Sequence, residues 1–168
     1  MLWKPGTMTT VTRTFAFAAA LCLLGAAQSH AWDAFYLGRF KIVDATPAPW
    51  VKSSDELDPA EPKDLIGKTI EINADSIAGP GSFPCQKPQY QVIEGGPEML
   101  FQGSFENMRA EDPSQDTLKL AAEAGFTADT HFRTVITGCE FDVDMSFGAD
   151  DNLARFALNN TIYTIRRE

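Results

Sequence analysis

Apolar and polar residues alternate along much of the chain from residue 34 onward. In segment 34–45, Phe40 and Ile42 fall on one face while basic residues fall on the other. Segment 65–81 separates isoleucines from polar residues with the same period of two, and segment 88–95 adds a shorter β-like run. Successive side chains of a strand point to opposite faces, so each pattern predicts a strand of an antiparallel sheet with one wet face.

The last forty residues carry the clearest alternation. Its members are Phe141, Val143, Met145 and Phe147 against Asp142, Asp144 and Ser146. We expect the apolar set to face a core and the acidic residues to face solvent. Segment 152–167 then predicts a hairpin in which Asn159 and Asn160 form a two-residue turn, because asparagine tolerates positive φ.

The middle of the chain contains helical signals. Segment 97–108 fits either a helical turn or a strand with partly buried apolar residues. Segment 114–125 is the one predicted helix: Ser114 or Asp116 can cap its beginning, and Gly125 can end it in a left-handed conformation.

Together these elements predict an all-β domain, mainly antiparallel, of six to eight strands with one short helix. Turn signals at short intervals favour a barrel that is closed or nearly closed, or a sandwich. Closure leaves no free sheet edge, so we expect a monomer.

The N-terminus has the pattern of a secretory leader. Residues 15–27 lack any polar side chain, but this run is too short for a spanning helix, which needs about 20 residues. Lys4 and Arg13 precede it, and the small residues Ser29 and Ala31 follow it. A positive start, a short apolar run and a small-x-small site predict a signal peptide.

We therefore expect a signal peptide at 1–31 and a single exported domain at 32–168, periplasmic or secreted, in a bacterium. Met8 is an alternative start to Met1. Leu21 stands before Cys22, where a lipoprotein signal requires a small residue, so we expect no membrane anchor after cleavage.

The net charge and the number of histidines exclude some classes of partner and of metal site. Without the leader, which contains Lys4 and Arg13, 12 of the 14 basic residues remain against 23 acidic ones, a formal charge of −11. Such a surface repels phosphate backbones, which excludes nucleic acid and favours a basic protein or cations. His131 is the sole histidine after residue 31, which excludes multi-histidine zinc sites.

Two cysteines, Cys85 and Cys139, remain beyond the leader. In an oxidising compartment an even pair predicts one disulfide. The alternative is a thiol site, but the two cysteines are far apart and form no CxxC motif.

The acidic residues between 138 and 152 suggest a calcium loop at first sight. An EF-hand counted from Asp142 requires glycine at its sixth position and glutamate at its twelfth, where this chain has Phe147 and Leu153. We therefore interpret the stretch as a strand and a turn, and we predict no metal site and no cofactor. Weak cation binding at Asp150 and Asp151 remains an alternative.

The two ends of the domain have sequence features that are similar to those of a known class of domains. Gly38-Arg39-Phe40 opens the first long strand, and Arg166 and Arg167 close the last. In these features the chain resembles small lipocalin-like and META-type exported bacterial β domains, which implies a small lipocalin-like barrel. The lipocalin signature has tryptophan where this chain has Phe40, and the threonine-aspartate-tyrosine run is absent, so the resemblance implies no binding residue.

Three function classes follow. The first is a non-catalytic binding module for a small apolar ligand. The residues that would line its cavity are Tyr36, Phe40, Tyr90, Phe141, Met145, Phe156 and Tyr163, and the alternative is that they simply fill the core. The second is an acidic inhibitor of a basic hydrolase such as lysozyme, for which opposite charge would speed encounter.

The third class is a small hydrolase. His131 with Asp129 and a serine, or Asp142 with Asp144, would supply its catalytic groups. No nucleophile motif surrounds them, so we expect no enzyme. Binding residues usually lie on loops of a rigid scaffold, and the long polar loops here are 45–64 and 106–117.

Overall fold

The computed structural model describes residues 34–52, 57–126, 129–140 and 143–168. The predicted signal peptide lies outside the described residues, as do Phe141 and Asp142. Within the described ranges, no helix has both the length and the apolar character that crossing a membrane requires. Residues 33–168 form one compact unit.

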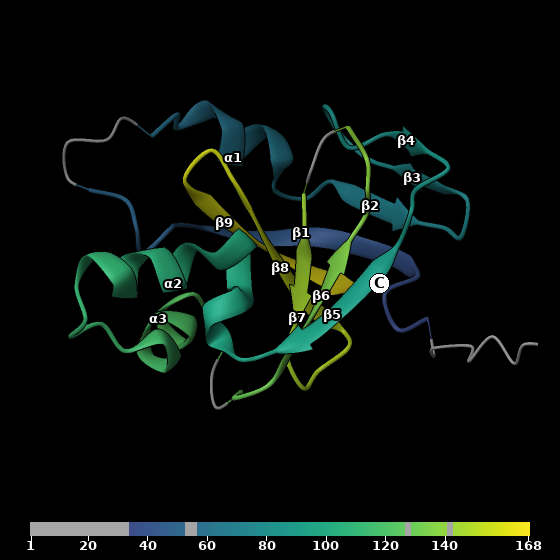
Figure 1. The fold of residues 1–168 in the computed structure, drawn as a ribbon. Coiled ribbons are helices and arrows are strands. Elements are labelled where there is room, and N and C mark those ends of the chain that lie inside the picture. Colours follow the sequence, from purple (N-terminus) through teal and green to yellow (C-terminus); the bar gives the residue numbers. More distant parts are fainter. Residues whose placement is uncertain (1–33, 53–56, 127–128, 141–142) are drawn as a thin grey trace, which may run out of the picture. The chain divides into compact units, whose positions relative to one another are not determined.

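The described part of this unit contains nine strands, three α-helices and one 3₁₀ helix (Figure 1). In chain order they are β1 (Gly38–Pro47), α1 (Ala60–Leu65), β2 (Thr69–Ile72), β3 (Ser76–Ala78), β4 (Cys85–Gln86), β5 (Gln91–Gly95), η1 (Pro97–Met99), α2 (Leu100–Glu111), α3 (Thr117–Glu123), β6 (Phe132–Ile136), β7 (Met145–Phe147), β8 (Leu153–Leu158) and β9 (Thr161–Arg167).

All nine strands form one sheet in the order β4-β3-β2-β1-β9-β8-β7-β6-β5, and every neighbouring pair is antiparallel. The predicted all-β antiparallel class is confirmed. The numbers of elements differ from the expectation of six to eight strands and one helix. Segment 65–81 turns back on itself after Ile72 and gives two strands, and the ambiguous segment 97–108 is helical.

The sheet curls into a half-barrel whose two edge strands come close together. β4 and β5 are the two ends of the strand order, yet only residues 87–90 connect them. Four residues reach roughly 14 Å when fully extended, so the chain itself holds the two edges near each other. The amide of Gln89 donates to the carbonyl of Thr137 at 2.7 Å, which continues the pairing of β5 with β6.

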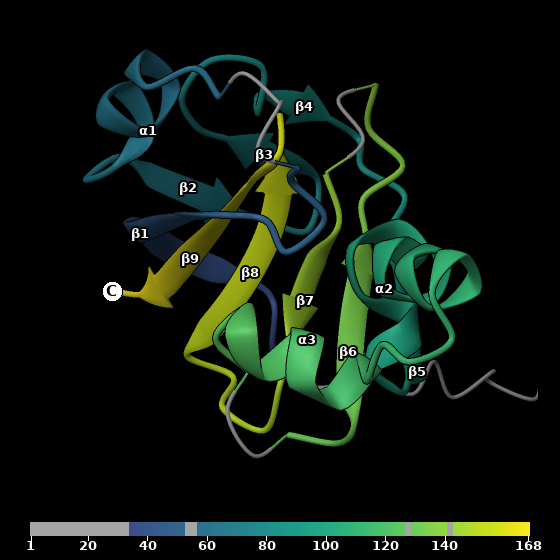
Figure 2. The same cartoon turned by 90° about the vertical axis from the view of Figure 1, so that its left-hand side faces the viewer.

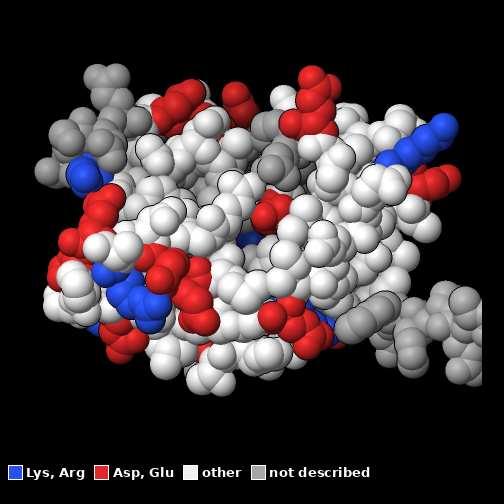
Figure 3. All heavy atoms as spheres, in the orientation of Figure 1, with Lys and Arg blue, Asp and Glu red and all other residues white. Residues whose placement is uncertain are grey.

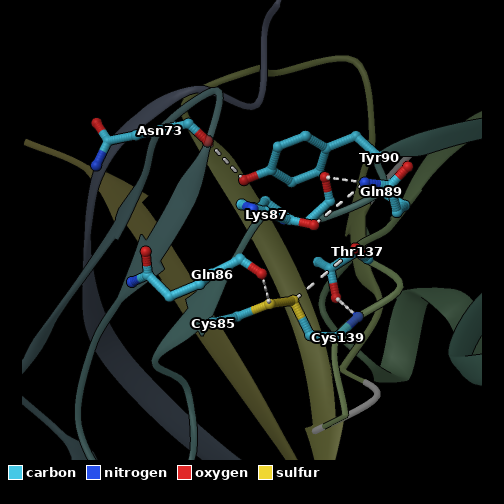
Figure 4. Close-up of a disulfide and its surroundings, with 9 residues drawn as sticks. Asn73, Cys85, Gln86, Lys87, Gln89, Tyr90, Thr137 and Cys139 are labelled. Atoms are coloured by element: carbon cyan, nitrogen blue, oxygen red, sulfur yellow. Dashed lines mark hydrogen bonds between the residues drawn. A yellow bond between two sulfur atoms is a disulfide. The ribbon is translucent and has the colours of Figure 1, made fainter.

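The predicted disulfide between Cys85 and Cys139 is confirmed, and it links the edge strand β4 to the opposite end of the sheet (Figure 4). Cys85 opens β4, and Cys139 follows β6; their Cα atoms are 6.0 Å apart. Beside it, the hydroxyl of Tyr90 donates to the carbonyl of Asn73 at 2.8 Å. A covalent bond and a hydrogen bond therefore both connect the β2–β4 end of the sheet to its β5–β6 end.

The sheet has a core on each face. Inside the curl, fifteen buried residues pack together; they are Phe40, Ile42, Leu65, Ile70, Ile72, Ile77, Phe83, Val135, Val143, Met145, Phe147, Ala154, Phe156, Tyr163 and Ile165. On the other face, α2 and α3 lie against the sheet (Figure 2). Leu100, Phe105 and Leu120 of these helices pack there with Phe132 and Ile162 of the strands.

One prediction about the strand before the 148–152 turn is wrong, because helices cover the face that was expected to be exposed. Val143, Met145 and Phe147 are buried as expected, but Asp144 is half-buried rather than exposed. Ser146, on the same face as Asp144, is fully buried, and its hydroxyl oxygen lies 3.0 Å from that of Thr134. A period of two reveals that a strand has two faces, but it does not reveal that helices cover the polar one.

Side chains close both ends of the half-barrel. At one end, Arg167 donates to the carbonyls of Phe35 and Leu37 and lies 4.5 Å above the ring of Phe40. At the other end, α1 brings the Glu61 carboxylate to the hydroxyl of Tyr163, which donates to it at 2.6 Å. The segment before β1 therefore covers one end of the half-barrel, and α1 covers the other.

The predicted turn of the last hairpin and the predicted ends of α3 are both confirmed. Asn159 and Asn160 have φ values of 46° and 65°, so the two-residue turn is confirmed. The Asp116 carboxylate accepts hydrogen bonds from two backbone amides in the first turn of α3, and Gly125 follows the helix at φ 93°.

We predict that the double change Cys85→Ser with Cys139→Ser lowers the free energy of unfolding by about 4 kcal/mol. In the loop-entropy model this is the stabilisation expected from a closed loop of 54 residues. Urea unfolding monitored by circular dichroism gives the value. Reductant should bring the wild type to the midpoint of the variant and leave the variant unchanged; equal midpoints without reductant would show that the bridge contributes nothing.

Candidate functional site

The residues predicted to line a barrel cavity lie in or beside the inner core. Phe40, Met145, Phe156 and Tyr163 are fully buried there. The rings of Phe156 and Tyr163 are stacked, with centroids 5.1 Å apart and planes at 16°. These four side chains touch one another and their neighbours rather than open space.

The remaining members of that set lie at the margin of the same core. Tyr36 and Tyr90 are half-buried, with their ring centroids 4.9 Å apart, and Phe141 lies outside the described residues. Burial raises the pKa of Tyr90 to about 12, with smaller contributions from Tyr36 and Asp75. Tyr90 is therefore a neutral hydrogen-bond donor at ordinary pH.

The inner core leaves little room for a ligand. A pocket bordered by Met145 and its inner-core neighbours Ile77, Phe83 and Val143 has a volume of about 10 Å³. A cavity of that size holds about one water molecule. An apolar ligand inside the curl would have to displace packed side chains, so a cavity role for the seven residues stays a prediction.

The acidic and histidine candidates have protein partners. Asp150 accepts hydrogen bonds from the amide and side chain of Asn152, and Asp151 forms an ion pair with Arg133. No group of three or more histidine, cysteine or acidic residues suited to a metal ion occurs among the residues described. His131 is exposed and lies 3.6 Å from the carboxylate of Glu94, whereas no contact with Asp129 is seen.

Two pockets on the outer surface meet at Trp50. The larger has a volume of about 400 Å³, and its walls include Met108, Glu111 and Asp112. The smaller has a volume of about 190 Å³, and its walls include Asp144. Trp50 and Ser104 line both pockets, so we treat them as one feature, the Trp50 groove.

Neighbouring elements fix the position of Trp50. It follows β1, its indole N–H donates to the Asn160 side chain at 3.2 Å, and its ring packs against Phe101 and Phe105 with centroids 5.6 and 6.1 Å apart. Trp50 is half-buried. The buried part of its side chain fixes its position, and the exposed part can contact a ligand in the groove. A rigid aromatic side chain held in this way is a common anchor of protein interfaces.

Strained backbone borders the smaller pocket. Phe101, Gln102 and Gly103 are consecutive residues with φ values of 52°, 59° and 79°, which interrupt the right-handed turn of α2. A left-handed residue other than glycine costs about 1–2 kcal/mol. Among the described residues, five non-glycine residues have positive φ, and four of them line this pocket.

The hairpin turn accounts for two of those four, Asn159 and Asn160, but no turn of this kind requires Phe101 and Gln102. Strained residues of this type persist where the surrounding structure fixes them, and they cluster at functional sites. Here Ser104 stabilises the turn, because its hydroxyl donates to the carbonyl of Phe101 at 2.7 Å.

Carboxylates predominate among the charged side chains of the groove. Glu111, Asp112 and Asp144 line it, against Lys52 alone among basic residues. Hydrogen bonds from the Ser114 side chain and amide and from Gln115 hold the pKa of Asp112 below its usual value, so this carboxylate is ionised. Figure 3 shows acidic side chains gathered over the α2 and α3 side of the molecule, with fewer basic ones between them.

Sequence reasoning placed the groove only coarsely. Two of its walls come from segments 45–64 and 106–117, which were expected to be polar loops that carry binding residues. The prediction of loops is wrong in part, because β1 runs to Pro47, α1 begins at Ala60 and α2 runs to Glu111. Trp50 itself gave no periodic signal, although a tryptophan between Pro49 and Val51 in a polar loop is a usable hint. Nothing in the sequence marks the left-handed turn except Gly103.

Comparisons with protein-family models, with curated proteins and with solved structures find no match to this chain. The lipocalin-like resemblance therefore stays a prediction, and the site is argued from its own geometry.

We predict that Gly103→Ala lowers the free energy of unfolding by about 1–2 kcal/mol. No atom lies within 4 Å of the position that the new Cβ would occupy, so the cost comes from the left-handed backbone alone. Gly103→Asn is the matched control, because asparagine tolerates this conformation and should recover part of the loss. Equal stability of Gly103→Ala and the wild type in urea would contradict the left-handed turn.

Proposed function

We propose that this is an exported, non-catalytic binding domain that recognises a basic segment of a partner protein in the Trp50 groove. The observation that carries the proposal is the junction of two pockets at one anchored tryptophan, with carboxylates in both. The proposed export rests on the predicted signal peptide, and the disulfide suits an oxidising compartment.

The sizes of the pockets favour a polypeptide over a compact small molecule. Sites for small ligands usually have volumes of roughly 300–1,000 Å³. The larger pocket falls in this range, but the smaller one, at about 190 Å³, is suited to a single side chain. An extended segment that lies in the larger pocket and inserts one side chain into the smaller would use both.

Charge and aromatic chemistry favour a basic segment. Glu111, Asp112 and Asp144 attract lysine and arginine, and the face of Trp50 offers a surface on which a guanidinium can stack. The formal charge of −11 beyond the leader adds long-range attraction, which speeds encounter with a basic protein. The same charge disfavours nucleic acid as the partner.

A basic hydrolase such as lysozyme is one partner that fits this chemistry. In that case the domain would act as an inhibitor, with the groove covering a basic surface segment of the enzyme. The acidic groove favours this version over an inhibitor that works through the packed interior of the half-barrel.

We predict that a short arginine-rich peptide binds the protein and that Trp50→Ala weakens binding roughly 30-fold. Truncating an aromatic anchor at the centre of an interface typically costs about 2 kcal/mol or more. Isothermal titration calorimetry with this peptide and with a glutamate-rich peptide of equal length measures the effect. Leu118→Ala is the matched control, since Leu118 is an exposed apolar residue of α3 outside the groove.

Binding should also weaken as salt rises, because charges at the surface are screened over roughly 8 Å at physiological ionic strength. Inhibition of lysozyme by the wild type, lost in Trp50→Ala, would identify the hydrolase class of partner. If neither salt nor Trp50→Ala changes the affinity for the peptide, the groove is not the binding site. Turnover of a hydrolase substrate, abolished by His131→Ala, would reject the non-catalytic role.

A further inference from the structure

Another pocket of the outer surface contains a guanidinium that has no hydrogen-bond acceptor among the described residues. Arg155 lies on β8, half-buried, with its guanidinium carbon 4.5 Å above the ring of Phe126. A Cβ at Gly125 would come within 2.8 Å of its Nε, so glycine at this position leaves room for the side chain. Aromatic stacking and this close approach hold the guanidinium in place.

Arg155 makes no hydrogen bond and no ion pair within the part of the chain that the structure describes, and its Nε is fully buried. A guanidinium carries five N–H donors, and the great majority of buried donors in proteins are paired. Burial lowers the pKa of Arg155, while the nearby carboxylates of Asp129 and Asp44 raise it. The fold thus keeps a partly desolvated cation that donates no hydrogen bond to the residues that the structure describes.

The Arg155 pocket has a volume of about 220 Å³ and contains a second charged group, the carboxylate of Asp129. Its Oδ1 accepts a hydrogen bond from the amide of Ala149 at 3.1 Å. Its Oδ2 accepts none from the described residues, and it lies 2.2 Å from where a Cβ of Gly148 would be. Glycine at 148 therefore permits the carboxylate to occupy this position.

The arrangement offers two opposite charges that do not pair with each other. A carboxylate in the pocket can accept the parallel N–H donors of Arg155. An ammonium group can donate to Oδ2 of Asp129, and Asp150 at the same pocket adds negative charge on that side. A phosphate or a dicarboxylate would be repelled by Asp129 and Asp150, so an anion without an ammonium group is a poor fit.

We propose that the Arg155 pocket binds a free α-amino acid with a small side chain, its carboxylate on Arg155 and its ammonium group on Asp129. The volume of about 220 Å³ is below the usual range for larger ligands, which limits the side chain. None of the residues that line this pocket lines the Trp50 groove, so the inference is independent of the proposed function.

The test measures binding of glycine, alanine and serine by isothermal titration calorimetry and by the rise in Tm, because a ligand of the folded state must stabilise it. Acetate and methylammonium, each carrying one half of the zwitterion, are the ligand controls. We expect millimolar or tighter binding of at least one amino acid, and at least tenfold weaker binding of both controls.

Two variants separate a ligand role from a structural one. Arg155→Met keeps the stacking surface on Phe126 but removes the donors. Asp129→Asn keeps an oxygen for the amide of Ala149 but removes the charge. We expect each variant to weaken amino-acid binding at least tenfold, with Asp129→Asn keeping the Tm of the ligand-free protein.

Binding that persists in both variants, or no amino acid binding at millimolar concentration, would overturn the proposal. If Arg155→Met does not fold, Asp129→Asn decides alone. The arginine-rich peptide should still bind Asp129→Asn, so failure of this site and failure of the Trp50 groove give different results.

Discussion

The connection of β4 to β5 is the constraint on which the rest of this structure depends. These strands are the two ends of a nine-stranded antiparallel sheet, yet four residues join them. The disulfide also ties β4 to Cys139, which follows β6, the strand next to β5. A sheet whose ends are tied must curl. Curling places one face of every strand toward a common interior, and the rings of Phe40, Phe156 and Tyr163 fill it.

Because the interior is filled, the proposed binding surface lies on the outside of the sheet. α2 and α3 cover part of the outer face (Figure 2). The Trp50 groove lies between α2, the loop after β1 and the β8–β9 turn. The Arg155 pocket lies between the end of α3 and the turn before β8. Both combine an aromatic or apolar surface with charged side chains in their walls.

Local signals in the sequence predicted the parts of the fold that depend on neighbouring residues. The period of two located the strands, Asn159 and Asn160 predicted their turn, and Asp116 predicted the cap of α3. The disulfide followed from counting cysteines. These succeed because side-chain direction, backbone angle and capping are properties of a few adjacent residues.

Features that depend on distant residues could not be predicted in this way. The burial of Ser146 requires knowing that two helices cover its face, and α2 itself was ambiguous because its first residues are left-handed. Trp50 becomes an anchor only when α2 and the last hairpin surround it. Arg155 is unusual because no acceptor among the described residues lies within hydrogen-bonding distance of it, and a sequence does not show which contacts are missing.

The central claim, that this domain binds at its outer surface and not in its interior, can be tested by mapping amide and indole signals in two-dimensional ¹H–¹⁵N spectra while the arginine-rich peptide is added. The account predicts that the indole N–H of Trp50 and the amides of Ser104 and Asn160 shift, while those of Phe40 and Ile72 in the inner core stay in place. Shifts centred on Phe40 and Ile72, with the Trp50 signal unmoved, would contradict it.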